Sequence, residues 1–165
     1  MERSTMEERK PLRPPALDPA TVAPAGPTTY PEPFRALVAG RERRRLGEAL
    51  GLKNFGVNLL RLPPGSASSQ RHWHSRQDEF VYVVAGEVVL VTDGGEQTLT
   101  AGMAAGFPAG KADGHHLINR AAADALVLEV GDRPAGDEAD YSDIDMLVRQ
   151  IDGKLRYVRK NGTPY

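Results

Sequence analysis

Glycine and proline divide the middle of this chain into short apolar segments, and this division most constrains the fold. The segments are rich in β-branched and aromatic residues, which is typical of strands. No long amphipathic helix is expected between them. Short strands at regular intervals, with a glycine or proline at each junction, favour an all-β sandwich or closed barrel. The expected strands span residues 55–62, 79–84, 87–92, 97–100, 103–107, 114–119 and 125–130.

The two ends of the chain differ from this middle region. Eight of the thirteen prolines lie between Pro11 and Pro33, and such a segment buries too little apolar area to offset the entropy of ordering it. We therefore expect a Pro-rich tail over residues 1–33, extended or disordered, and a β-barrel over 34–132. Residues 133–165 are expected to add strands over 141–148 and 154–159, which form a hairpin packed on the barrel.

Composition excludes several classes of function. The net charge is −1, from 21 basic and 22 acidic residues, which argues against a general nucleic-acid or membrane-surface binder. The absence of cysteine excludes disulfides and thiolate chemistry. No Gly-rich phosphate loop lies between a strand and a helix. With no apolar span and no secretory signal, a cytoplasmic protein is expected.

A basic run, Arg41-Glu42-Arg43-Arg44-Arg45, precedes the first of these strands. One interpretation is a patch that binds anions or nucleic acid. The other is a solvated edge of the domain, which the balanced net charge and the lack of further basic runs favour.

The four histidines form two tight groups, 72/74 and 115/116. His72 and His74 are two residues apart, so a strand places both on one face. Glu79 begins the next expected strand and can reach the same point. Adjacent residues of a strand face opposite ways, so only one of His115 and His116 can also point inward. Three imidazoles and one carboxylate suit one divalent metal ion, Mn, Fe, Ni, Co or Zn. The alternative is that His72 and His74 are ordinary surface residues.

Two spaced motifs resemble those of the cupin superfamily. The first consists of Gly65, His72, His74, Glu79 and Gly86, with one extra residue between Gly65 and His72. The second consists of Gly102, Pro108, Gly110, His115 and Asn119, with two extra residues before the histidine. The resemblance implies a double-stranded β-helix, or cupin barrel, with the metal in its mouth. It also selects His115 as the fourth ligand, beside His72, His74 and Glu79.

The alternation of a strand predicts which side chains line this barrel. Val81 and Val83 share a face with Glu79 and should line the cavity wall. Phe80, Tyr82 and Val84 should face the other way. Asn119 lies on the face of His115, where its amide is expected to hold a loop carbonyl in place.

The chain as a whole also resembles small single-domain bacterial cupins, some of which are described as sugar-phosphate isomerases. The resemblance rests on residues 46–52, on the Phe107–Gly110 loop and on residues 141–146. It implies a metal-dependent isomerase of a small polar metabolite such as a sugar phosphate. The phosphate would need cations near the ligands, for which Arg71, Arg76 and Lys111 are the candidates. The sequence marks no general base.

Two other functions fit the same residues. Iron in the site would make a dioxygenase of a small molecule, and a barrel without catalysis would bind or sense a small ligand. Trp73, on the outer side of the ligand strand, would pack either on a second subunit or beneath a terminal segment. Cupin barrels frequently pair by sheet edges, so a homodimer is expected.

Overall fold

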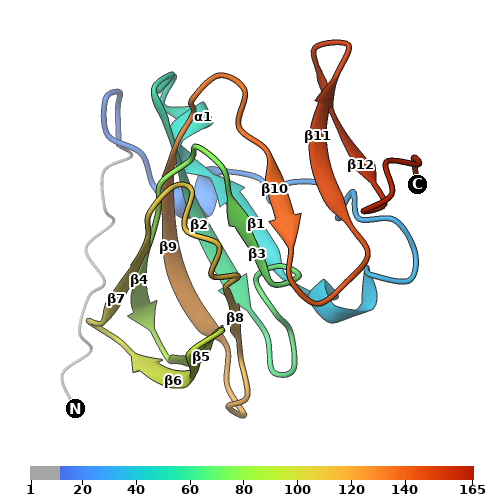
Figure 1. Ribbon diagram of the computed structural model, residues 1–165. Coiled ribbons are helices and arrows are strands. Elements are labelled where there is room, and N and C mark those ends of the chain that lie inside the picture. Colours follow the sequence, from blue (N-terminus) through green and yellow to red (C-terminus); the bar gives the residue numbers. More distant parts are fainter. Residues whose placement is uncertain (1–11) are drawn as a thin grey trace, which may run out of the picture.

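The computed structural model describes residues 12–165, which form a predominantly antiparallel β structure (Figure 1). Three short helices are present: η1 (Pro19–Thr21), η2 (Ala36–Val38) and α1 (Leu46–Ala49). None of the helices in these residues is long and apolar enough to cross a membrane. The strands are β1 (Glu42–Arg45), β2 (Phe55–Leu62), β3 (His72–His74), β4 (Glu79–Ala85), β5 (Glu87–Thr92), β6 (Gly95–Thr100), β7 (Ala104–Phe107), β8 (His116–Ile118), β9 (Ala125–Asp132), β10 (Ala139–Tyr141), β11 (Leu147–Ile151) and β12 (Lys154–Val158).

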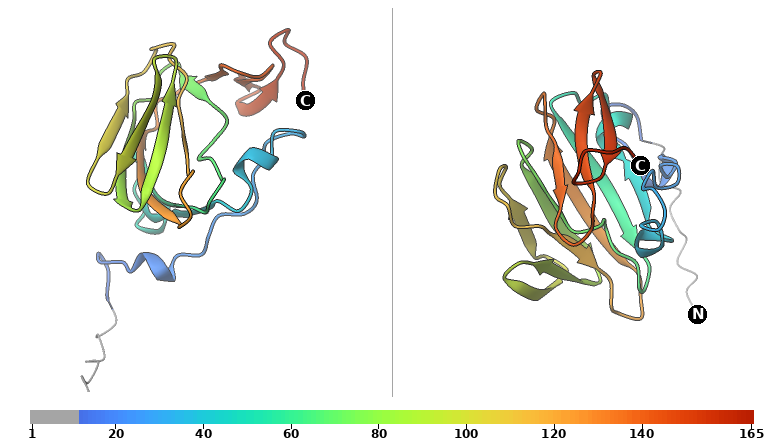
Figure 2. Two further views of the ribbon diagram at one scale, coloured as in Figure 1. Left: turned by 90° about the horizontal axis from the view of Figure 1, so that it is seen from below. Right: turned by 45° about the vertical axis from the view of Figure 1, so that its right-hand side comes forward.

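The strands form three sheets, two of which face each other as a barrel. Their orders are β1-β2-β9-β4-β7, β6-β5-β8 and β12-β11-β10-β3. Strand β3 also meets the second sheet through a bridge between His72 and His115. The all-β class is confirmed, and β2 and β5 begin and end at the expected residues. The left view in Figure 2 shows the hairpin β11–β12 lying away from the barrel.

The core lies between the two facing sheets. Leu60, Leu62, Val83 and Val127 are fully buried there, with 0% exposure each. Strand β4 shows the expected alternation, since Val81 and Val83 are buried while Phe80, Tyr82 and Val84 are exposed. The apolar contacts of this cluster hold the sheets together, because burial of apolar area is the main favourable contribution to folding.

Gly86 makes the sharp break between β4 and β5. Its φ is +75°, and a Cβ atom at this position would lie 2.8 Å from the carbonyl oxygen of Asp124. Only glycine meets both conditions without strain.

The two ends of the chain meet in a second apolar cluster that sequence analysis missed. Tyr30 is 5% exposed and packs with Val38, Tyr141 and Met146. The residues before Tyr30 follow the free edge of β1, where the Ala25 amide donates to the Arg43 carbonyl over 2.7 Å. Of the expected tail, residues 1–11 lie outside the described residues.

Two expectations about local structure are wrong. Residues 141–148 do not form one strand, because the chain turns between β10 and β11 and the Tyr141 amide donates to the Met146 carbonyl. The basic run is not a fully solvated edge either. Strand β1 pairs with β2, and the side chain of Arg43 is only 28% exposed because it forms an ion pair with Glu129.

Replacing Asn119 with alanine should destabilise the barrel by about 2 kcal/mol or more, since buried groups left without partners each cost about 1–3 kcal/mol. Asn119 has 0% exposure. Its amide donates to the carbonyls of Leu62 and Ala123, both over 2.8 Å, as expected of a residue that holds a loop. Urea unfolding measures the change. Arg120→Ala, next in sequence but exposed, is the control, and an equal loss in both variants would contradict the assigned role.

Candidate metal centre

Strand β3 is only three residues long, yet it carries two of the histidines and is held on both sides. Along one side it pairs with β10, where Ala139 lies opposite His74 and Tyr141 opposite His72. On the other side the His72 and His115 backbones exchange two hydrogen bonds, of 3.2 and 2.8 Å. This bridge places the second histidine motif beside the first, although the two are about forty residues apart in sequence.

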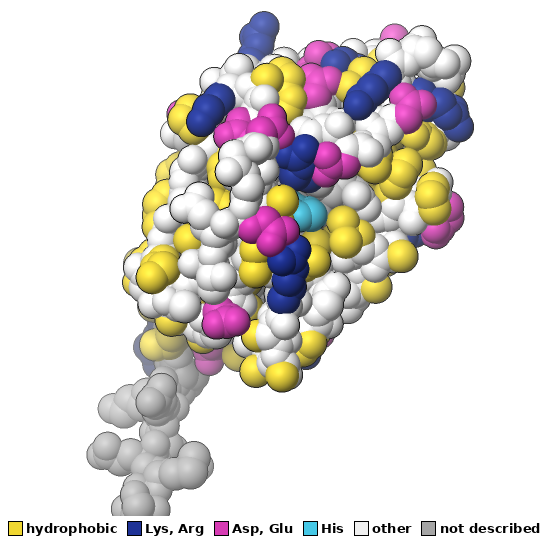
Figure 3. All heavy atoms as spheres, turned by 60° about the horizontal axis from the view of Figure 1, so that its bottom comes forward, with side chains coloured by type: hydrophobic (Ala, Val, Ile, Leu, Met, Phe, Trp, Pro, Cys, Tyr) yellow, Lys and Arg dark blue, Asp and Glu magenta, His cyan; other side chains and the backbone are white. Residues whose placement is uncertain are grey.

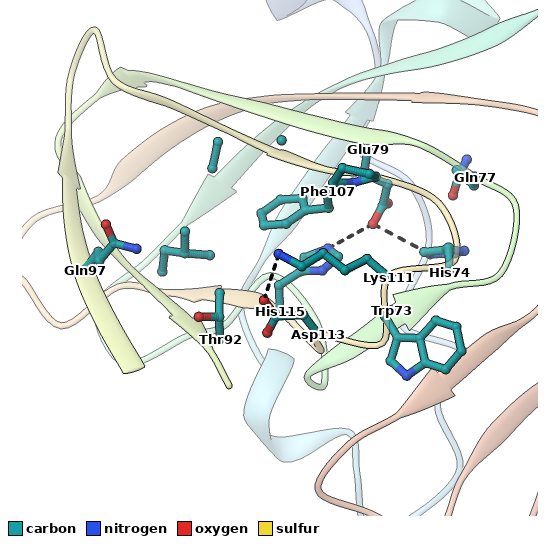
Figure 4. A pocket seen from close by; sticks show the side chains of 14 residues that line it. Trp73, His74, Gln77, Glu79, Thr92, Gln97, Phe107, Lys111, Asp113 and His115 are labelled. Atoms are coloured by element: carbon teal, nitrogen blue, oxygen red, sulfur yellow. Dashed lines mark hydrogen bonds and ion pairs between the residues drawn. The ribbon is translucent and has the colours of Figure 1, made fainter. Parts of the chain in front are cut away.

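Three imidazoles converge on the carboxylate of Glu79, the first residue of β4. The distances from Glu79 Oε2 to the Nε2 atoms are 3.0 Å for His115, 3.7 Å for His74 and 3.9 Å for His72. One ligand atom from each of His72, His74 and Glu79 lies within 4.8 Å of the others. Figure 4 shows His74, Glu79 and His115 pointing toward one another at the wall of a pocket.

The outer ring nitrogens decide which tautomers His72 and His74 adopt. Nδ1 of His72 lies 2.9 Å from the carbonyl oxygen of Gln70, which can only accept. Nδ1 of His74 lies 2.6 Å from the carboxylate of Asp137. Both Nδ1 atoms therefore carry the proton in the neutral rings, and both Nε2 atoms present a lone pair to the centre.

Those two lone pairs lie close together, since the Nε2 atoms of His72 and His74 are 3.1 Å apart. Two lone pairs at this distance repel each other unless a cation lies between them. Nitrogen donors from three imidazoles with one carboxylate oxygen are a donor set that divalent first-row metals accept. The residues present therefore fit a metal ion.

Packing holds two of the rings in place. Phe107 stacks on His115 with centroids 3.5 Å apart and an interplanar angle of 1°. Tyr141 stacks on His72 at 5.5 Å. Rings fixed in this way keep their nitrogens aimed at the centre without a further ordering cost when a ligand binds.

The electrostatics of the centre keep its donors in the form that binds metals. Burial lowers the pKa of His72 to about 4, so the ring is neutral near pH 7. Burial alone would raise the pKa of Glu79, but the His115 hydrogen bond and the charges of His72 and His74 outweigh it. The net result lowers the pKa of Glu79 to about 2. A neutral imidazole and an ionised carboxylate are the ligand forms.

The structure separates the two adjacent histidines. His115 faces Glu79, whereas His116 Nδ1 lies 3.1 Å from the carbonyl oxygen of Ser69 and away from the other rings. The H-x-x-x-N spacing of the second motif selects His115 as the ligand, and this assignment stays a prediction.

Of the three basic residues considered for phosphate binding, only Lys111 lines the pocket at the histidines. Arg71 instead binds Asp143 through two hydrogen bonds, of 2.8 and 2.6 Å, and also pairs with Asp93. Arg76 is exposed and contacts the Ala135 carbonyl. The guanidinium of Arg71 is thus held by carboxylates that are distant in sequence, which spacing could not reveal.

The pocket itself has a volume of about 200 Å³ and combines apolar and polar walls. Phe107, Leu90 and Ala105 form the apolar part, while Gln77, Gln97 and Thr92 add polar groups. Figure 3 shows acidic and basic side chains interspersed on one face of the molecule, with a histidine visible among them. His74, Glu79 and His115 line the pocket, so a small molecule in the pocket would contact the centre.

Sequence analysis missed Asp137, a carboxylate in the loop before β10. Besides His74, it accepts from the backbone N–H groups of Arg76 and Gln77, over 2.8 and 3.0 Å. Burial would raise the pKa of Asp137, but the Arg76 amide and the His74 ring outweigh this and lower it. A carboxylate behind a ligand histidine fixes the ring and strengthens it as a donor. No local signal marks Asp137, because its partner lies 63 residues away.

Comparison with known proteins shows the family of the chain. A family model described as the cupin domain matches residues 58–131. A crystal structure described as a sugar phosphate isomerase from a cupin superfamily, from Silicibacter pomeroyi, is similar to this chain. The two sequences are 46% identical, the match covers 92% of this chain and 96% of that one, and the TM-score is 0.87. The chain belongs to the cupin superfamily. No curated protein matches it.

Other cupin-like structures are more distant. A protein from Acidithiobacillus ferrooxidans, whose name proposes sugar phosphate isomerase activity, is 27% identical over 76% of this chain and 80% of that chain, with a TM-score of 0.69. A polyketide cyclase from Streptomyces resistomycificus is 18% identical over 71% of this chain and 78% of that chain, with a TM-score of 0.59. The second likeness shows the shared fold alone.

Replacing His115 with alanine removes one of the proposed ligands. It should weaken metal binding by more than roughly 10–100-fold, which is the cost of losing a residue that only hydrogen-bonds to a ligand. Replacing His116 should leave metal affinity close to that of the wild type, because its ring faces the Ser69 carbonyl. Elemental analysis and metal titration of both variants test the difference. The reverse ranking would show that the other histidine of the pair is the ligand.

Asp137→Asn should lower metal affinity roughly 10–100-fold while leaving one binding site, because the His74 ring loses its anionic partner. Glu138→Gln is the matched control, since the neighbouring Glu138 pairs with Arg149 and not with a histidine. Metal titration and thermal unfolding of the same samples separate affinity from folding. Equal affinities in the two variants would exclude the orienting role.

Proposed function

We propose that this cupin is a metal-dependent enzyme that acts on a small polar metabolite and interconverts the aldose and ketose forms of a sugar phosphate. The observation that carries the proposal is the convergence of three imidazole nitrogens on one carboxylate, with the lone pairs of His72 and His74 facing each other. The 46% identity to a protein named as a sugar phosphate isomerase supports the substrate class.

The proposed metal ligands are His72, His74, Glu79 and His115, which would hold one divalent ion, Mn, Fe, Ni, Co or Zn. When bound, such an ion supplies Lewis acidity, which polarises a substrate carbonyl and stabilises negative charge on its oxygen. The side chains of Phe107 and Leu90 form part of the apolar wall of the pocket. Lys111 at the rim, 3.5 Å from Asp113, can contact polar groups of the substrate.

Isomerisation also moves a proton between neighbouring carbons, which requires a base close to the centre. We assign this role to Glu129 of β9. Glu79 pairs with Gly131 and Val81 with Glu129 across β4 and β9, so the two carboxylates are diagonal neighbours on the inner face, about 7–8 Å apart between Cα atoms. Arg43 donates to both oxygens of Glu129, over 2.7 and 2.9 Å, which orients the carboxylate.

The test begins with protein purified without added metal, whose metal content is measured before each candidate ion is added. Aldose and ketose phosphates are then incubated in D₂O. We expect metal-dependent interconversion with deuterium incorporated next to the carbonyl. Chelation and His74→Ala should abolish it, whereas His116→Ala should retain it. Glu129→Gln should lower turnover about 10²–10⁴-fold, the usual contribution of a general base, with unchanged metal content.

The other outcomes identify the alternatives. Bound iron with oxygen uptake and no isomerisation would indicate a dioxygenase. A folded protein that binds none of the metals would indicate a ligand-binding barrel. The homodimer and the cytoplasmic location stay predictions, and light scattering of the purified protein measures the former.

A further inference from the structure

A larger cavity, of about 570 Å³, lies beside the metal centre under strand β1. It shares His72, Glu79 and His115 with the centre, and its other walls include residues of β1, β2 and β9, of the segment before β1 and of the loop that carries Ser68 and Ser69. A molecule in this cavity can therefore contact the proposed metal ligands at one end and the basic run at the other.

Three of the four arginines of the basic run face this cavity, because alternate residues along β1 and just before it point to the same side. Arg41, Arg43 and Arg45 line it, whereas Arg44 points outward and donates to the Val22 carbonyl. Arg43 pairs with Glu129 at 2.7 Å, and Arg45 with Glu48 at 3.4 Å. These two arginines are thus neutralised by carboxylates of the barrel.

Arg41 differs from its neighbours because no carboxylate within residues 12–165 lies at ion-pair distance from it. Its guanidinium donates to the Ser68 carbonyl, lies 3.5 Å from the Thr28 hydroxyl, and stands 5.7 Å from the centre of the Tyr30 ring. Burial, with repulsion from Arg43, lowers the pKa of Arg41. A partly buried cation without an anion is costly, and the contacts described use two of its five N–H donors.

The Thr28 hydroxyl contacts this guanidinium, and further residues with hydroxyl groups line the cavity toward the histidines. Thr28 and Tyr30 lie at the Arg41 end of the cavity. The Ser68 and Ser69 hydroxyls are 3.5 Å apart, and Ser69 Oγ lies 3.3 Å from His72 Nδ1. A guanidinium with several hydroxyl donors is the chemistry that binds the oxygens of a phosphate group.

We propose that the cavity under β1 is the phosphate subsite of the enzyme, in which Arg41 binds the phosphate of a substrate whose carbonyl end reaches Glu79 and the histidines. This rests on the proposed function for the nature of the substrate. It assigns the phosphate to Arg41 instead of Lys111, which is 66% exposed at the rim of the smaller pocket and already paired with Asp113.

The experiment measures binding of inorganic phosphate to the metal-loaded full chain by calorimetry at fixed ionic strength. Arg41→Gln should raise the Kd for phosphate about tenfold or more, since a hydrogen bond to a charged group contributes about 1.5–3 kcal/mol and 1.4 kcal/mol is tenfold. Arg44→Gln, with the same change of charge on the outer face of β1, should change it less than about twofold, because Arg44 does not line the cavity and donates to the Val22 carbonyl instead.

Metal content measured on the same samples separates this proposal from that of the previous section. Arg41→Gln should bind as much metal as the wild type. A wild type that binds no metal would contradict the proposed function, whereas the phosphate Kd of the Arg41 and Arg44 variants would still test the subsite. If Arg41→Gln does not fold, Arg41→Lys, which keeps the charge but loses the planar fork, should still raise the Kd. The subsite would be overturned by a wild type that binds no phosphate, by equal losses in the Arg41 and Arg44 variants, or by a loss confined to Lys111→Gln.

Discussion

The facing lone pairs of His72 and His74 are the interaction on which the site depends. Their Nε2 atoms lie 3.1 Å apart, and each ring is held in that tautomer by an acceptor behind it, the Gln70 carbonyl or the Asp137 carboxylate. The backbone places the rings there, because β3 is paired with β10 and bridged to His115. The two lone pairs repel each other, but the backbone and the acceptors behind the rings hold them in place. A cation between them would remove the repulsion.

The same sheet supplies both the core and the wall of the site. Along the inner face, β2, β9 and β4 present Leu62, Val127 and Val83 at one end, all fully buried. Toward the mouth, β9 and β4 present Glu129 and Glu79 instead. The apolar end stabilises the barrel, and the rigid strands hold the charged end in fixed geometry. The proposed proton transfer and metal binding would therefore use side chains that are already ordered before a substrate binds.

Charge is arranged in pairs throughout this mouth, which explains how so many ionised groups lie near one centre. Arg43 neutralises Glu129, and the imidazoles lower the pKa of Glu79. Arg41 stands outside this pairing, among hydroxyl groups and an aromatic ring. A site with one uncompensated cation beside a metal centre favours an anionic substrate with a polar body, and a sugar phosphate has both features.

The sequence by itself determined most strands of the barrel, the all-β class and the residues whose roles follow from local periodicity. His72 and His74 share a face because a strand alternates every two residues, and Asn119 and Val81 were placed by the same rule. Tertiary structure alone decided the rest. Arg71 is held by Asp143, Asp137 supports His74, and Arg43 turns inward to Glu129 across 86 residues. Such contacts depend on which strands pair across the barrel. Because the partners are far apart in sequence, they leave no periodic pattern from which they could be predicted.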